Sequence, residues 1–451
     1  MNLVDKDLKY IWHPCSQMKD YEELKPMVIE RGEGVYLYDI YGNRYLDAIS
    51  SWWCNLFGHA NERINNAIKA QIDKIEHVIF ANFSNVPAIE LSERLVNITP
   101  DRLQKVFFAD NGSAAVEIAL KMSFHYHQQI GKFKKQKFVA ITDAYHGETL
   151  GALSVGDLDI YNKVYKPLMI DTYRVKGPNC YRCPYGEIRS SCDAECFEHM
   201  RLLIEGNNEE VSAIIVEPIV QGAAGMKIYS TKYLKKLREL CDKYDINLIA
   251  DEIAVGYGRT GKMFACEHAE ISPDIMCLSK GLTAGYMPMS VVMTSKKLYN
   301  AFYGDYSAYK AFLHSHTYSG NAMGCAIALE VLKIFEEDNV LDMINKKGKM
   351  LNDILIDELE GHPLIGEIRN IGLINAIELV QDKESKEPFN SEKRVGYEIY
   401  KIALKKGVIL RPIANCIYFN PPYIIEEKEM REMVKVCKES LNKYMIKFLK
   451  D

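Results

Sequence analysis

The sequence has no apolar run that approaches the length of a membrane span. Its opening stretch, Met1 to Asp7, is polar and lacks the apolar core of a signal peptide. Neither sign of charge dominates, because the formal net charge is −5 across 451 residues. Internal repeats and low-complexity tracts are also absent. We therefore expect a soluble, cytoplasmic protein with no nucleic-acid or membrane partner, long enough to form two domains.

The cysteines leave one question open. Most of the 12 are scattered, and we expect them to be reduced thiols. Four form two close pairs in a polar stretch that contains prolines: Cys180, Cys183, Cys192 and Cys196. Such pairs resemble structural zinc spacing, although the gap between them is short. Reduced thiols are the first interpretation, a metal or disulfides remain open, and no catalytic metal is expected.

Two apolar stretches of strand length end on groups that carry chemistry. Residues 274–279 lead into Lys280, where desolvation would lower the pKa of the amine and make it a better nucleophile toward an aldehyde. Residues 246–250 lead into Asp251. If the two strands are neighbours, both groups meet at the carboxyl edge of the sheet, where ligands bind in α/β proteins. A surface lysine is the alternative interpretation.

Pyridoxal phosphate needs this pair, an amine for its aldehyde and an acid for its pyridinium nitrogen. The pattern therefore predicts Lys280 and Asp251 as catalytic residues that also contact the cofactor. Gly112 and Ser113 follow another strand and open a helix, so their N–H groups predict a phosphate site, with a plain N-cap as the alternative. Strands that alternate with helices over residues 105–295 predict a mostly parallel sheet.

A third strand, residues 137–141, leads to Tyr145 and His146. The tyrosine ring can stack on the cofactor's pyridine face, whereas the role of His146 is open. Nearer the N-terminus, alternation around Gly42 predicts a hairpin. Trp52 and Trp53 follow it and, on a strand, would face opposite ways, so both cannot be core. One buried tryptophan and one at a subunit interface is the alternative to a role in the substrate site. The later part of the chain predicts a helical stretch over 322–359, strands over 367–380 and 408–419, and a helix over 426–449.

The ordered run Asp251-Glu252-Ile-Ala-Val-Gly256-Tyr-Gly258-Arg259-Thr260-Gly261, followed by Pro273-Asp274 and Ser279-Lys280-Gly281, resembles the signature of class III aminotransferases. The resemblance implies an α/β fold of type I, with a mostly parallel sheet in a large pyridoxal-phosphate-binding domain. A small α+β domain from both chain ends would complete it. We expect the small domain to take residues 1–59 and 336–451, and the large domain residues 60–335. A homodimer with active sites at the interface is also implied.

The same resemblance assigns further site residues. An aromatic side chain at the position of Tyr145 would cover the cofactor ring and border the substrate. His316 and Thr317 would hold the cofactor phosphate of the other subunit, with Ser315 on the substrate side. Arg411 lies between two strand-like runs, where the family commonly holds a substrate carboxylate with the planar fork of an arginine.

Trp12-His13-Pro14 and Ser51-Trp52-Trp53 more narrowly resemble the branch that aminates 8-amino-7-oxononanoate in biotin biosynthesis. Trp52 and Trp53 would form an apolar wall for a long methylene chain, and Arg259 would help to shape the pocket. S-adenosylmethionine is the usual amino donor. However, Cys15 stands where most members carry tyrosine, and Ser315-His316 stand where glycine and proline are usual. Some relatives take the amino group from lysine instead of S-adenosylmethionine, and they differ in these two places. Cys15 is therefore assigned to the substrate site, and the amino donor is left open.

Three alternatives remain. Another class III ω-aminotransferase, for ornithine, 4-aminobutyrate or a polyamine, would have no need of the tryptophan wall. A non-catalytic binding or redox protein built on the cysteine pairs would leave Asp251 and Lys280 without a purpose. A nicotinamide-dependent dehydrogenase is disfavoured because Gly112 lies in no Gly-x-Gly-x-x-Gly run.

Overall fold

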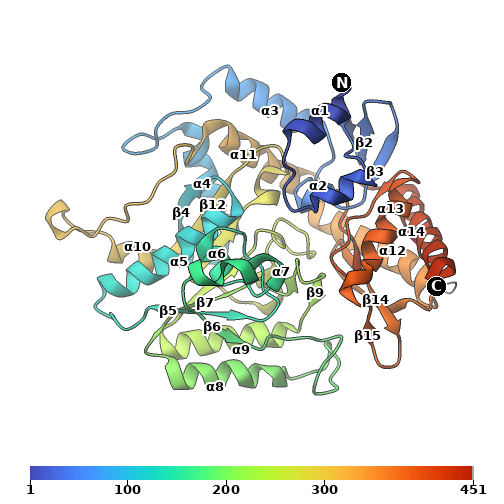
Figure 1. The fold of residues 1–451 in the computed structure, drawn as a ribbon. Helices are drawn as coiled ribbons and strands as arrows, with labels where there is room; N and C mark the ends of the chain where they lie inside the picture. The colour runs from blue at the N-terminus through green and yellow to red at the C-terminus, as the bar shows by residue number, and fades with distance from the viewer. Residues whose placement is uncertain (449–451) are drawn as a thin grey trace.

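The structure is a computed structural model that describes residues 1–448 (Figure 1). A seven-stranded sheet crosses the larger part of the molecule, in the spatial order β4 (Leu103–Ala109), β12 (Ser290–Ser295), β11 (Ile275–Leu278), β10 (Asn247–Asp251), β7 (Val211–Val216), β5 (Lys137–Ile141) and β6 (Tyr173–Val175). β12 runs antiparallel to both of its neighbours. The other pairings are parallel, which confirms the predicted mostly parallel sheet.

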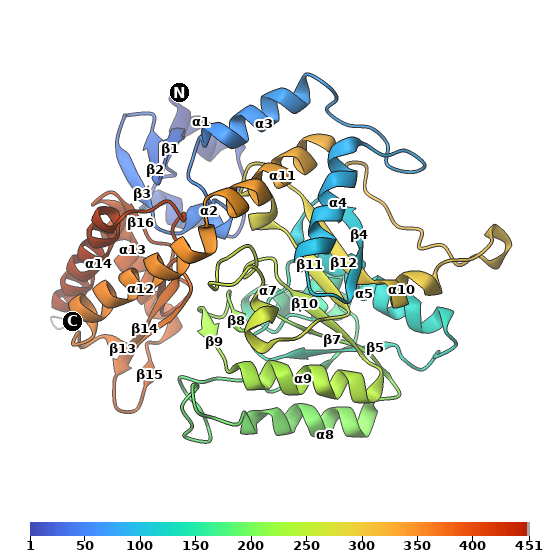
Figure 2. The same cartoon turned by 180° about the vertical axis from the view of Figure 1, so that it is seen from behind.

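Both faces of this sheet are buried, as its continuous apolar strands require. In β5, for example, Phe138 and Ala140 enter one core, whereas Val139 and Ile141 enter the other. The first core is completed by side chains of α5 (Gly112–Gln129), α6 (Leu150–Ser154) and α10 (Lys296–Ala301). The second is completed by α4 (Val86–Ile98), α8 (Glu198–Asn207), α9 (Thr231–Tyr244) and α11 (Ala322–Glu337) (Figure 2).

The two ends of the chain meet beside the large sheet (Figure 1). The parallel pairing of β16 (Val408–Ile409) with β3 (Arg44–Asp47) joins them, and β2 (Tyr36–Asp39) and β1 (Ile29–Glu33) continue that sheet. β2 and β3 form the predicted hairpin around Gly42. The C-terminal part adds a second sheet of β13 (Ile365–Ile371), β14 (Ile374–Asp382), β15 (Glu387–Pro388) and β17 (Cys416–Phe419).

Helices pack around these smaller sheets. They include α12 (Val340–Leu359), α13 (Val395–Leu404) and α14 (Glu427–Phe448). The N-terminal part also contains α1 (Leu3–Tyr10) and α2 (Ser50–Trp53), whereas α3 (Glu62–Ile72) packs against α11. The type I fold is therefore confirmed, while the domain boundaries at residues 59/60 and 335/336 remain a prediction. Among residues 1–448, no helix is both long enough and apolar enough to cross a membrane.

The predicted helical stretch over 322–359 is present in two pieces. α11 ends at Glu337, and Asn339 has a left-handed φ of 49° before α12 begins. Asparagine tolerates this conformation better than most residues, which explains the break. The predicted final helix corresponds to α14, and its expected last residue, Leu449, lies outside the described residues.

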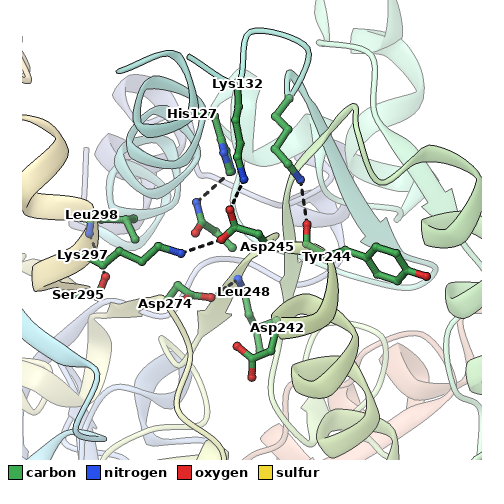
Figure 3. Close-up of polar contacts among 12 residues, drawn as sticks. His127, Lys132, Asp242, Tyr244, Asp245, Leu248, Asp274, Ser295, Lys297 and Leu298 are labelled. Carbon is green, nitrogen blue, oxygen red and sulfur yellow. Dashed lines mark hydrogen bonds and ion pairs between the residues drawn. The ribbon is translucent and has the colours of Figure 1, made fainter. Parts of the chain in front are cut away.

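Hydrogen bonds between charged side chains stabilise the amino-terminal edge of the large sheet, opposite the carboxyl ends of β10 and β11 (Figure 3). Asp245, which caps α9 with a left-handed φ of 50°, accepts hydrogen bonds from Lys132 and Lys297. Deeper in the fold, Asp274 accepts from Arg238 at 2.7 Å and from the backbone N–H of Leu248 at 2.9 Å. These contacts set the register of the strands that lead to the site.

Candidate active site

Asp251 and Lys280 come together at the carboxyl edge of the sheet. β10 and β11 are parallel neighbours, with Asp251 aligned to Cys277, and Lys280 begins the 3-10 turn η5 (Lys280–Thr283). Lys280 has a left-handed φ of 44°, a strained conformation for a non-glycine residue. Burial lowers the pKa of its amine, an effect that Asp251 opposes. The neutral, nucleophilic form of Lys280 is therefore more accessible than that of a lysine in water.

Asp251 is held by His146, whose role the sequence left open. Nδ1 of His146 lies 2.8 Å from Oδ2 of Asp251, and both side chains are buried. The other carboxylate oxygen of Asp251 accepts from the N–H of Ile253 at 3.1 Å. Nε2 of His146 is buried with no partner in residues 1–448. The carboxylate is thus fixed in position at the end of its strand.

The N-terminus of α5 faces the same edge. Asn111 caps the helix by accepting from the N–H of Ala114 at 3.0 Å. The N–H groups of Gly112 and Ser113 keep no acceptor within the described chain, as expected for the first turn of a helix. A side chain at Gly112 would meet Ile253, since a Cβ there would lie 3.1 Å from its Cδ1. Asn111 serves as the N-cap, and the phosphate site at Gly112 and Ser113 remains a prediction.

Tyr145 follows β5 and is positioned through its backbone. Its N–H donates to Glu217 at 3.1 Å, and the other oxygen of Glu217 accepts from Gly222 at 2.9 Å. Its hydroxyl donates to Glu148 at 3.0 Å. Gln221 donates to the carbonyl of Thr142 at 2.8 Å, while its Oε1 is buried without a partner in the described residues.

The tryptophan pair lies on a left-handed turn and not on a strand. Ser50, Ser51, Trp52 and Trp53 all have positive φ, between 45° and 76°. Buried Asp47 holds the turn by accepting from the N–H of Ser51 at 3.0 Å and from its hydroxyl at 2.7 Å. The prediction that the two tryptophans are not both in the core is nevertheless confirmed, because Trp53 is 6% exposed and Trp52 is 43% exposed. Trp53 lies beside Lys280, with Nζ 5.1 Å from its ring centroid.

Arg259 supports this turn from beneath. It is 1% exposed, and its guanidinium donates to the carbonyls of Trp53 and Asn55, both at 3.3 Å, and of Pro421 at 2.9 Å. Its charge also lies over the ring of Tyr423, 4.7 Å from the centroid. Arg259 therefore ties the tryptophan turn to the C-terminal part of the chain, and its expected part in shaping the pocket remains a prediction.

Chain segments far apart in sequence meet on the open side of the site. The guanidinium of Arg411 lies 4.0 Å from the ring centroid of Trp52 and donates to the carbonyl of Cys15 at 3.3 Å. The sulfur of Cys15 is 3.7 Å from the hydroxyl of Tyr161, whose ring centroid is 5.3 Å from that of Tyr145. Cys15, Trp52, Tyr145 and Arg411 are thus brought together, and Tyr161 joins them.

The single chain does not bring Ser315, His316 and Thr317 to Lys280. Ser315 and Thr317 are exposed. His316 lies beside Asp110, with Nδ1 2.9 Å from Oδ2. Their assignment to the other subunit's cofactor remains a prediction.

The paired cysteines surround one small cavity of about 20 Å³, lined by Cys180, Cys183, Cys192 and Cys196. All four are free thiols. Burial raises the pKa of Cys180 and of Cys196 to about 11. Within residues 1–448, no group of three or more histidine, cysteine or acidic side chains is arranged to hold a metal ion.

A family model described as aminotransferase class-III matches residues 17–441. The chain belongs to the class III aminotransferase family. An adenosylmethionine-8-amino-7-oxononanoate aminotransferase from Geobacter sulfurreducens is 45% identical over 98% of this chain and 97% of the relative. The crystal structure of the enzyme of the same name from Methanocaldococcus jannaschii matches with a TM-score of 0.92 and 43% identity, covering 98% of both chains. The omega transaminase from Pseudomonas jessenii, in complex with PMP, matches with a TM-score of 0.93 at 33% identity over 98% of both chains.

Class III aminotransferase chemistry implies pyridoxal phosphate, and the site has the groups to fit it. An amine for the aldehyde, a carboxylate for the ring nitrogen and free N–H groups for the phosphate all lie at one sheet edge. The partnerless Nε2 of His146 and Oε1 of Gln221 are also what a bound group would satisfy.

Sequence reasoning missed two residues of this class III aminotransferase site. The sequence offers no role for His146, because only the fold shows that its ring reaches Asp251. Nothing in the sequence distinguishes Tyr161, since a tyrosine in a short helix, α7 (Asp159–Asn162), has no characteristic pattern.

Proposed function

We propose that this aminotransferase converts 8-amino-7-oxononanoate to 7,8-diaminononanoate in biotin biosynthesis, with S-adenosylmethionine as the first-choice amino donor. The observation that carries the proposal is the Trp52–Arg411 stack at 4.0 Å, beside the Trp53–Lys280 contact at 5.1 Å. An apolar wall that ends in a cation suits a long methylene chain with a terminal carboxylate. Near-full-length similarity to enzymes named for this acceptor agrees with it.

Pyridoxal phosphate, when bound, supplies an electron sink for the carbon that carries the amino group. In this proposal Lys280 would hold the cofactor and would act as the general base toward the proton at the reacting carbon. The lowered pKa of Lys280 suits that work, because a neutral amine can accept a proton. Asp251, oriented by His146 at 2.8 Å, keeps the ring nitrogen protonated. Gly112 and Ser113 would hold the phosphate, and Tyr145 would cover the ring.

The donor is the finer part of the proposal. Cys15 lies at the open side of the pocket, where its carbonyl meets Arg411 at 3.3 Å. Most members of this branch carry a tyrosine at this position, and a thiol is a weaker hydrogen-bond donor than that phenol. Lysine is therefore the second candidate for the molecule that supplies the amino group to 8-amino-7-oxononanoate.

We further infer a homodimer whose sites lie at the subunit interface. The segment between α10 and α11 extends away from the fold and exposes large apolar side chains, among them Tyr306 and Leu313, each 91% exposed (Figure 1). Exposed apolar surface of this kind marks an interaction site. Ser315, His316 and Thr317 lie on this segment. In the dimer, His316 and Thr317 would contact the cofactor phosphate in the partner's site, and Ser315 would contact the substrate there. A cytoplasmic location agrees with biosynthetic chemistry on soluble substrates.

The test is product formation from 8-amino-7-oxononanoate, with S-adenosylmethionine and lysine as donors in separate reactions. Activity with S-adenosylmethionine would support the first-choice donor, and activity with lysine alone would support the second. No product with either would reject the acceptor and leave another class III ω-aminotransferase activity.

Lys280→Ala should abolish measurable turnover, with a loss in rate of at least about a thousandfold, because the amine both anchors the cofactor and moves the proton. Mass spectrometry after borohydride reduction should find the cofactor on the wild type and not on the variant. Lys349→Ala is the matched control, since the Lys349 side chain is 76% exposed on α12, where it pairs with Asp353 at 2.6 Å. Near-normal turnover in Lys280→Ala would reject the scheme.

A further inference from the structure

Tyr161 lies on the substrate side of the pocket. Its ring centroid is 5.3 Å from that of Tyr145, and its hydroxyl is 3.7 Å from the sulfur of Cys15. The backbone carbonyl of Cys15 accepts from Arg411 at 3.3 Å. Cys15 therefore touches the Tyr161 hydroxyl on one side and the Arg411 guanidinium on the other.

The short helix that carries Tyr161 is fixed to the chain around Tyr145. Asn162, the next residue, is buried and donates to the carbonyl of Gly156 at 3.2 Å. The N–H of Asp157 donates to the carbonyl of Ala144 at 2.8 Å. Tyr161 is consequently held in place relative to Tyr145, as recognition of a small substrate requires.

Both candidate donor groups are available to a ligand. The only hydrogen-bond contact of the Tyr161 hydroxyl within the described chain is the thiol of Cys15, a weak partner. Arg411 has no carboxylate partner among residues 1–448. A hydroxyl and a guanidinium that both contact Cys15 form a donor pair that matches the two oxygens of a carboxylate.

We propose that Tyr161 is a specificity residue that, together with Arg411, binds the carboxylate of the substrate. This inference rests on the proposed function and adds a second hydrogen-bond donor to it. Arg411 supplies the charge, and the Tyr161 hydroxyl selects for an acceptor oxygen at the end of the chain. Carboxylate substrates are therefore distinguished from equally long substrates without the charge.

The test compares 8-amino-7-oxononanoate with its methyl ester in the wild type and in Tyr161→Phe, which keeps the ring. The KM for the acid should rise about tenfold, as expected for the loss of one hydrogen bond to a charged group at a partly exposed site. The KM for the ester should rise less, by about threefold, because the ester carbonyl still accepts from the hydroxyl but lacks the charge that strengthens the bond. The kcat should stay within about twofold for both substrates. A structural defect would instead affect the acid and the ester alike.

Two control variants sharpen the test. Tyr165→Phe makes the same substitution on the exposed side of the same segment and should change neither KM. Cys15→Ala removes the thiol contact of Tyr161 from the other side. If the hydroxyl merely holds Cys15, Cys15→Ala and Tyr161→Phe will behave alike, which would overturn the proposal. We expect Cys15→Ala to leave the ratio of acid to ester KM unchanged.

A binding measurement separates this inference from the proposed function. Calorimetric titration of the cofactor-loaded enzyme with nonanoate should show about tenfold weaker binding to Tyr161→Phe than to the wild type, without turnover. If the wild type makes no product but nonanoate discriminates the two proteins, the proposed acceptor fails and Tyr161 stands. Equal nonanoate binding by both proteins would overturn the role of Tyr161.

Discussion

Buried carboxylates next to the reacting groups are held by backbone N–H groups. Glu252, which follows Asp251, accepts from Ala265 at 2.9 Å and from Cys266 at 2.8 Å. Burial nevertheless raises its pKa to about 7, because desolvation of the charge outweighs these two hydrogen bonds. Glu217 is similar, with its pKa raised by burial to about 7. Individual residues at this edge therefore link the stability of the fold to pH.

Glu252→Gln should reveal that link. The folded pKa lies above the usual value of 4.5, so protonated Glu252 stabilises the wild type below pH 4.5, and this stabilisation is lost as the pH rises through about 7. Glutamine does not titrate. The free energy of unfolding of the wild type should therefore fall relative to that of the variant, by about 3 kcal/mol between pH 4.5 and pH 8. Urea denaturation at several pH values measures the difference, and a difference that is constant or rises with pH would contradict the assignment.

Pairs of oppositely charged residues at the amino ends of the strands differ in burial. Burial decides how much each pair contributes to the free energy of unfolding. Arg238 and Asp274 are 7% and 6% exposed and lie 2.7 Å apart between α9 and β11. Asp245, whose side chain is 42% exposed, pairs with Lys132 and Lys297 at the end of α9 (Figure 3). Removing one member of a buried pair leaves an uncompensated charge, whereas water screens an exposed pair.

Asp274→Asn should therefore destabilise the protein by about 3 kcal/mol, because Arg238 loses its buried counter-charge and keeps only Asp242, whose side chain is 45% exposed, at 3.0 Å. Asp245→Asn should lower the free energy of unfolding by only about 1 kcal/mol. Asparagine tolerates the left-handed backbone of position 245, so the second variant measures charge alone. Urea denaturation of both variants at one pH tests the contrast. Equal losses would show that burial does not separate the two clusters.

At the scale of the whole molecule, the site forms where the large sheet meets the smaller sheets built from the two ends of the chain. β16 brings Arg411 beside the N-terminal turn that carries Trp52, because β16 pairs with β3. Buried Arg259 ties the same turn to the C-terminal part through Pro421 at 2.9 Å. The exposed segment between α10 and α11 then reaches outward, where we propose that it completes the partner's site.

Replacing Tyr306 and Leu313 together by serine should weaken the dimer, because burying each side chain is worth about 1.5–3 kcal/mol. Sedimentation should find monomer at concentrations where the wild type is dimeric, and activity should fall in parallel. Tyr41→Ser is the control, since Tyr41 is 70% exposed on the hairpin between β2 and β3. An active monomer would contradict the shared site.

The sequence alone determined the mostly parallel sheet, the positions of Asp251 and Lys280 at its edge and the start of a helix at Gly112. These depend on local signals, namely apolar runs of strand length, polar exits and helix caps, which survive without long-range information. The family signature added a function that no periodicity could supply.

Tertiary structure decided the rest, for a physical reason that is the same in each case. His146 reaches Asp251, and Cys15, Tyr161 and Arg411 meet, across separations of 105 to 396 residues, and single-sequence patterns carry no information on such pairings. The left-handed turn of Trp52 and Trp53 is stabilised by buried Asp47 and Arg259, so local preference alone could not have predicted it. The sequence thus set the chemistry of the site, and the fold decided which distant side chains surround the substrate.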